Sequence, residues 1–138
     1  MRARSSWALL VVTAIGCGRV NYDERRGLDA NDPAACPSGT TEIQPGGDVC
    51  IELVERGTVP WTTAKSMCES LGRRLCADAE WFTACVNATG LVDMIDGGYE
   101  WVAEEMDGVA LKRGSTACTV MSSHAVVDPY EYRCCVTR

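Results

Sequence analysis

Histidine is nearly absent from this sequence of 138 residues, which contains only one. It has nine cysteines, yet no two of them are separated by two residues. Zinc and iron sites usually need histidines or such closely spaced cysteine pairs. The adjacent Cys134 and Cys135 cannot easily aim both sulfurs at one ion, because neighbouring residues of a strand face opposite ways. We therefore expect disulfides rather than a metal or another cofactor, formed outside the reducing cytosol.

Positive charge and long apolar runs are also scarce. The net charge is −6, so the chain would repel nucleic acid and anionic lipid headgroups. One apolar run of nine residues, 7–15, is too short to cross a bilayer as a helix, and no other run is long enough. We expect neither a nucleic-acid-binding protein nor one with a membrane-spanning helix.

The N-terminus has the order of a signal peptide. Arg2 and Arg4 precede the apolar run, and small residues then lead to Cys17. Residues 14–17 resemble the lipobox of bacterial lipoproteins, in which the cysteine is lipidated and becomes the new N-terminus. If Cys17 carries a lipid, eight cysteines remain, an even number that can form four disulfides. The alternative is an ordinary secretory signal with a chance cysteine, and the protein would then be secreted.

Three segments follow from this interpretation. Residues 1–16 are the signal peptide, residues 17–35 are the lipid-bearing cysteine and a polar tether, and residues 36–138 are the folded domain. Cleavage removes two arginines and takes the net charge from −6 to −8. Gly18 and Arg19, with no aspartate beside Cys17, favour the outer membrane by analogy with known sorting behaviour.

Two helices are expected early in the domain. Thr62 or Thr63 would cap the first, and Gly72 would end it. Its apolar residues recur at helical spacing, at Trp61, Ala64, Met67, Cys68 and Leu71. Asp78 would cap the second helix, over residues 79–88, with one apolar face formed by Trp81, Ala84, Cys85 and Ala88.

Short strands separated by turns make up the rest. We expect them at 40–43, 49–54, 75–76, 99–103, 109–112 and 132–136. Cys36 and Cys50 would close the first hairpin as a disulfide. Two helices combined with short strands give an α+β fold. A domain of this size has a small core, and four disulfides would each add about 2–4 kcal/mol.

Four segments resemble, in order, the formylglycine-generating enzyme family, also called the sulfatase-modifying factor family. The first is the cysteine, glycine and tryptophan spacing of residues 64–85. Residues 99–102, 112–115 and 132–135 then resemble the family's "WEW", "RGGS" and "GFRC" segments. The resemblance covers residues 49–138. It implies an elaborated C-type-lectin-like fold, with two helices and small, mostly antiparallel sheets.

The same resemblance argues against the family's activity. Those enzymes hold copper(I) between two cysteines, because soft thiolates suit that ion. The resemblance puts Cys118 at the first of these positions but Ser123 at the second, and a hydroxyl is a poor substitute for a thiolate. We predict no enzyme activity, no catalytic residue and no cofactor. The alternative is a degenerate oxidoreductase that retains metal or redox chemistry at Cys118.

Spacing alone leaves the pairing of the eight cysteines open beyond Cys36 and Cys50. The resemblance implies that Cys68 joins Cys134 or Cys135, and that the other of these two reaches Cys118. Cys76 is then left with Cys85.

A sugar site of the C-type-lectin kind is not indicated, since the Glu-Pro-Asn, Gln-Pro-Asp and Trp-Asn-Asp motifs that bind calcium there do not occur. Candidate calcium ligands remain in one acidic region, at Asp93, Asp96, Glu100, Glu104, Glu105 and Asp107, although we favour a solvated acidic surface. Trp61, Trp81 and Trp101 fit core positions, with sugar stacking as the alternative for Trp101. His124 is interpreted as a surface or loop residue.

The sequence therefore predicts a non-catalytic binding or structural domain on the cell envelope. The lipid on Cys17 would tie it to a membrane. Its ligand would be an envelope protein or a glycan, and not a nucleic acid.

Overall fold

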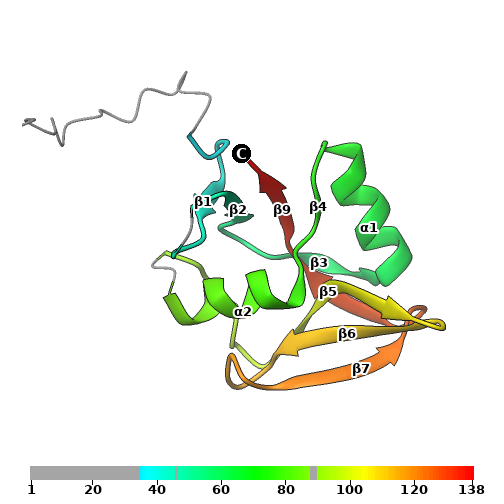
Figure 1. Cartoon of the computed structure of the whole chain (residues 1–138). Coiled ribbons are helices and arrows are strands. Elements are labelled where there is room, and N and C mark those ends of the chain that lie inside the picture. The colour runs from blue at the N-terminus through cyan, green and yellow to red at the C-terminus, as the bar shows by residue number, and fades with distance from the viewer. Residues whose placement is uncertain (1–34, 46, 88–89) are drawn as a thin grey trace, which may run out of the picture.

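Two helices and two sheets form the part of the chain that this computed structural model describes, residues 35–45, 47–87 and 90–138. Cys17, the signal peptide and nearly all of the tether lie outside these residues. Figure 1 shows α1 (Trp61–Ser70) beside the short strand β4, and α2 (Asp78–Asn87) over one end of the larger sheet. No helix in the described ranges is long and apolar enough to cross a membrane.

The smaller sheet has four strands. In spatial order they are β1 (Thr40–Glu42), β2 (Val49–Glu52), β9 (Cys134–Thr137) and β4 (Arg74–Leu75). The larger sheet has five. They are β3 (Arg56–Pro60), β8 (Pro129–Tyr132), β5 (Tyr99–Met106), β6 (Val109–Gly114) and β7 (Met121–Ala125). All pairings are antiparallel except that of β5 with β8, which is parallel. The predicted α+β architecture with small, mostly antiparallel sheets is confirmed.

Helix α1 is held by a narrower apolar face than the sequence predicted. Trp61, Ala64 and Cys68 are buried against the larger sheet, but Met67 and Leu71 are 42% and 50% exposed. The buried residues lie three positions before and four positions after Ala64, whereas Met67 touches the sheet through its sulfur, which accepts from the Tyr132 hydroxyl at 3.2 Å. The capping prediction was also wrong, because the helix starts after Pro60 and no side chain caps it.

The predicted end of α1 is confirmed. Gly72 has a φ of +67°, which glycine adopts at little cost, and its N–H donates to the Glu69 carbonyl at 3.0 Å.

Helix α2 packs Trp81 and Ala84, both 0% exposed, into the core as predicted. Asp78 is its first residue rather than its cap, and the Asp78 carboxylate forms an ion pair with Arg113 of β6. Glu80 instead accepts the Ala77 N–H at 2.8 Å, which satisfies an otherwise free donor at the helix start. Ala88, predicted on the apolar face, lies outside the described residues.

Four disulfides use eight cysteines. The predicted Cys36–Cys50 bond is present, and Cys68 pairs with Cys134, one of its two predicted partners. The other predicted pairs are wrong. The bonds observed are Cys76–Cys135 and Cys85–Cys118.

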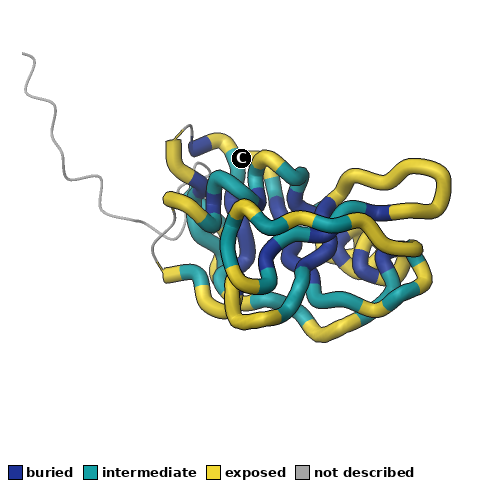
Figure 2. Tube along the Cα trace, turned by 90° about the horizontal axis from the view of Figure 1, so that it is seen from below, coloured by how far each residue is buried: buried dark blue, intermediate teal, exposed yellow. Residues whose placement is uncertain are grey.

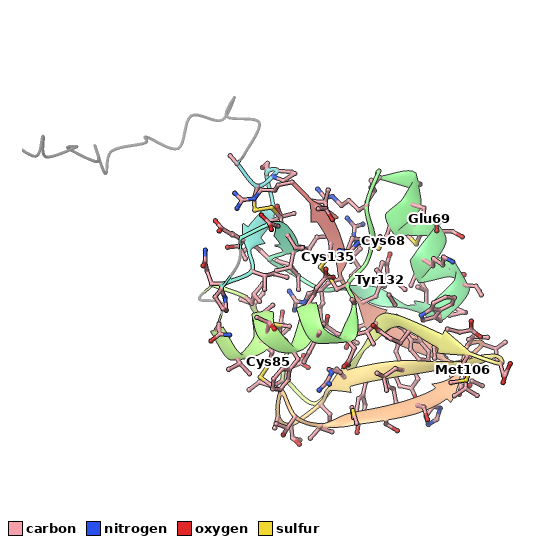
Figure 3. All side chains as sticks on the ribbon, viewed as in Figure 1. Cys68, Glu69, Cys85, Met106, Tyr132 and Cys135 are labelled. Atoms are coloured by element: carbon pink, nitrogen blue, oxygen red, sulfur yellow. A yellow bond between two sulfur atoms is a disulfide. The ribbon has the colours of Figure 1, made fainter. Side chains whose placement is uncertain are left out.

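The reason for the error is the register of β4. This strand runs antiparallel to β9, with Arg74 opposite Cys135 and Leu75 opposite Cys134. Cys76 follows Leu75 and therefore lies diagonal to Cys135 on the same face of the sheet, where the two form a disulfide. Adjacent strand residues face opposite ways, so Cys134 bonds toward α1 while Cys135 bonds toward the start of α2. Cys68 and Cys135 are labelled in Figure 3, near the centre of the molecule.

The predicted closing strand 132–136 is interrupted at Arg133, where the chain passes from β8 in one sheet to β9 in the other. Arg133 is fully buried and pairs with Glu100, whose carboxylate oxygens are 3.0 and 3.1 Å from Nε. Its other nitrogens donate to the carbonyls of Leu53 and Val92. Trp81 donates to the same Glu100 carboxylate at 3.0 Å.

The sequence pattern did not predict three strands, β3, β7 and β8. They carry proline, glycine, serine and charged residues rather than an alternating apolar pattern. β3 and β7 are the outer strands of the larger sheet, and β8 lies between β3 and β5.

Two glycines with positive φ give a test of this packing. A methyl group at Gly114 (φ +96°) would lie 2.7 Å from the Met94 carbonyl oxygen and 3.3 Å from the Trp81 ring. At Gly108 (φ +79°) it would meet nothing within 4 Å. We expect Gly108→Ala to lower the free energy of unfolding by about 1 kcal/mol through backbone strain, and Gly114→Ala by about 3 kcal/mol. Urea unfolding followed by tryptophan fluorescence measures both, and equal losses would contradict the close packing at Gly114.

Candidate functional site

Cys118, the residue that the family resemblance marks for chemistry, is bonded to Cys85 of α2. Both cysteines are half-buried, and Figure 3 shows Cys85 at the lower edge of the helix. The second marked position, Ser123, lies on β7 opposite Leu111 of β6 and is exposed. A disulfide sulfur and a serine hydroxyl do not form a thiolate pair for copper(I).

The six predicted calcium ligands do not converge. Glu100 is buried against Arg133 and Trp81. Glu104 accepts the Asp78 N–H, and Glu105 accepts the Gly108 N–H at 2.7 Å, so both of these carboxylates stabilise local structure. Asp107 sits in the turn after β5, and Asp93 in the loop before it; both have positive φ.

A different carboxylate cluster is present, formed by Glu55, Asp96 and Glu131. One oxygen from each lies within 4.8 Å of the others, and this is the only group of three or more such side chains found in the described residues. Glu55 follows β2, Asp96 precedes β5, and Glu131 lies on β8. Only Asp96 was among the predicted ligands. The other two could not be found from spacing, because strand pairing alone brings them together.

Two carboxyl groups of this cluster have raised pKa values. Burial, followed by the negative charges of Glu131, Glu100 and Asp96, raises the pKa of Glu55 to about 7. Burial and the nearby charges of Asp96 and Asp93 also raise the pKa of Glu131. Oε2 of Glu55 is enclosed and accepts no hydrogen bond from the described residues. A proton shared within the cluster would relieve this repulsion.

The cluster offers three oxygens to a divalent cation. Calcium takes six to eight oxygen ligands, so the three carboxylates would be a minority of its shell. The raised pKa of Glu55, together with its enclosed Oε2, indicates instead that this carboxyl can hold a proton near neutral pH.

The aromatic candidates are structural. Trp61, Trp81 and Trp101 are 8%, 0% and 0% exposed, so their predicted core positions are confirmed. Trp101 Nε1 donates to the Val59 carbonyl at 3.0 Å, and a ring this buried does not stack on a sugar. His124, predicted as a surface or loop residue, is an exposed surface residue on strand β7, with Nδ1 2.7 Å from Asp128 Oδ2.

Solved structures of C-type-lectin-like domains resemble this chain. Against the mouse CD72a domain the TM-score is 0.52 at 15% identity, covering 74% of this chain and 93% of that one. For EMS16, an antagonist of the collagen receptor integrin α2β1, the TM-score is 0.53 at 13% identity, covering 75% and 100%. For a calcium-independent type II antifreeze protein it is 0.52 at 12% identity, covering 75% and 95%.

The protein has a C-type-lectin-like fold. No protein-family model and no curated protein matches the sequence. Because the identities are 12–15%, the likeness carries the fold and not the function of these proteins. The C-type-lectin-like fold that the sequence predicted is thus confirmed.

The raised pKa of Glu55 predicts a pH dependence of stability. In the unfolded chain this carboxyl titrates near 4.5, and in the fold near 7, so the fold favours its protonated form. The contribution of Glu55 to stability should therefore fall as the pH rises from 4.5 to 7 and then stay level. Glu55→Gln should raise the free energy of unfolding by about 1 kcal/mol at pH 8 and leave it unchanged below pH 4.5, a discounted value because the side chain is partly solvated.

Urea unfolding at several pH values, with a chelator present to exclude divalent cations, measures this effect. Glu69→Gln on the exposed side of α1 is the matched control and should change stability at neither pH. An equal gain from both variants would mean that net charge, and not the cluster, sets the pH dependence.

Proposed function

We propose that the protein is a non-catalytic binding or structural domain displayed on the cell envelope by a lipid on Cys17. The observation that carries this proposal is the Cys85–Cys118 disulfide, together with the three other bonds that use the domain's remaining cysteines. A domain stapled in this way suits an oxidising compartment. It also has no thiolate to offer as a nucleophile or copper ligand.

The fold supports a role in binding. Of the solved structures that resemble this chain, one is named as an antagonist of the collagen receptor integrin α2β1 and one as an antifreeze protein, and neither name is that of an enzyme. The partner here would be an envelope protein or a glycan. The ordered resemblance of residues 64–135 to the formylglycine-generating enzyme family suggests a short, non-catalytic relative of those enzymes. An oxidoreductase acting through Cys118 would need that thiol free, whereas its sulfur is bonded to Cys85.

The proposal predicts the number of free thiols. The exported, purified chain, denatured without reductant, should give no reaction of Cys118 with dithionitrobenzoate, and eight domain thiols should appear only after reduction. Mass spectrometry of non-reduced peptides should join Cys85 to Cys118. A free, fast-reacting Cys118 in the native protein would favour the oxidoreductase instead.

Lipid attachment is tested separately, in bacteria fed an alkyne-labelled fatty acid. We expect the chain to take up the label and to fractionate with the outer membrane. Cys17→Ser should abolish both results, because the thioether acceptor is lost. Cys36→Ser is the matched control: it removes another cysteine near the N-terminus of the domain but should leave labelling intact. Persistent labelling of the Cys17→Ser protein would exclude Cys17 as the anchor.

A further inference from the structure

The hairpin of β5 and β6 projects beyond the body of the domain. Residues 103–109 are all exposed, and Figure 2 shows them as a long loop extending away from the core. Asp107 and Gly108 form the tight turn with φ values of +54° and +79°, the pair that two-residue hairpins favour. Glu105 Oε1 accepts the Gly108 N–H at 2.7 Å and holds the tip. The projection is therefore a defined surface.

A groove of about 570 Å³ runs along one side of this hairpin. We call it the hairpin groove. Its apolar lining is formed by Met106, Val109 and Leu111. Met106 is 74% exposed and Val109 is 44% exposed, and Figure 3 shows Met106 at the end of the projection. Helix α2 reaches β6 where Asp78 meets Arg113.

The charged residues that line the groove are all acidic. Glu104, Glu105 and Asp107 contribute carboxylates, and no lysine or arginine is among its lining residues. Arg113, on the same strand as Leu111, is engaged by Asp78 and by the Cys118 carbonyl. Three apolar side chains and three carboxylates thus line the same groove, which makes it complementary to a ligand that is both apolar and cationic.

The course of the groove suggests the shape of that ligand. β5, β6 and β7 are neighbours in the larger sheet, and the groove is lined by Met106 of β5, Leu111 of β6 and Ser123 of β7. A ligand that covers the groove therefore crosses three strands, with about 4.8 Å between neighbours, which suits an extended segment whose side chains alternate along its length.

We propose that the hairpin groove binds an extended segment of a partner protein in which lysine or arginine alternates with apolar residues. This inference rests on the proposed binding function and names its site and partner chemistry. Apolar side chains of the segment cover Val109, Leu111 and Met106. Its basic side chains face Glu104, Glu105 and Asp107. A small apolar molecule would not need the carboxylates, and a second copy of this acidic chain would bring like charge to them.

The test uses the full chain and a synthetic ten-residue peptide that alternates lysine and leucine. Isothermal titration calorimetry at low salt should show binding that weakens as salt is added, because the exposed ion pairs are screened. A lysine–serine peptide and a glutamate–leucine peptide should bind at least about tenfold more weakly, since each lacks one half of the complementarity.

Matched variants locate the site. Val109→Lys places a cation among the lining residues and should weaken binding about tenfold or more through like-charge contact. Val127→Lys makes the same change at a 72% exposed valine that does not line the groove, and should leave binding within about twofold. Asp107→Asn keeps a residue that tolerates positive φ and should weaken binding several-fold without altering thermal unfolding.

Three results would overturn the inference: no binding of the lysine–leucine peptide, equal binding of the lysine–serine peptide, or equal weakening by Val109→Lys and Val127→Lys. Sedimentation that shows a dimer of the wild-type chain, dispersed by Val109→Lys, would mean that a second copy occupies the groove. The proposed function fails on other measurements, free thiols and absent lipid. If the protein is lipidated and fully disulfide-bonded but does not bind the peptide, the groove inference is wrong and the proposed function still stands.

Discussion

The buried pair of Arg133 and Glu100 is the contact on which the two-sheet architecture depends. The last stretch of chain leaves the larger sheet at Tyr132 and enters the smaller one at Cys134, with Arg133 between them. A guanidinium without exposure to water is tolerable only if its charge and its donors are satisfied. Glu100 supplies the charge, and the carbonyls of Leu53 and Val92 accept the remaining donors. One side chain thus joins β5, the bend after β2 and the loop before β5.

The two cysteines that follow Arg133 link the crossover strand β9 covalently to the helical part of the domain. Because Cys134 and Cys135 face opposite ways, one ties β9 to α1 and the other ties it to the segment that leads into α2. The closed loops are long, at 66 and 59 residues, and bonds that close long loops restrict the unfolded chain most. A small core can then tolerate a buried ion pair and a repulsive carboxylate cluster, because covalent links offset part of their cost.

The sequence allowed the helices and most strands to be predicted, but not the contacts between distant segments. Trp81 and Ala84 could be assigned to the core because their spacing is a local property. Cys76 and Cys135 could not be paired, because their meeting depends on the register of a two-residue strand. Glu55 and Glu131 were missed for the same reason, whereas Glu100 was misread as a surface carboxylate since nothing local distinguishes a buried partner of arginine from a solvated one.

The cross-links and buried contacts of this domain are concentrated in its core, and the tip of the β5–β6 hairpin has few of them. Three of the four disulfides, the three tryptophans of the described residues and the Arg133 pair lie where the helices meet the sheets. The fourth disulfide, Cys36–Cys50, ties the chain before β1 to β2. The hairpin tip carries no disulfide, and its exposed Met106 and Val109 make no contribution to either core cluster. Apolar side chains held in water by a rigid turn do not stabilise the isolated fold, since burial is what makes them favourable. In the proposed binding function a partner buries these side chains, at a hairpin tip that no disulfide ties to the rest of the domain.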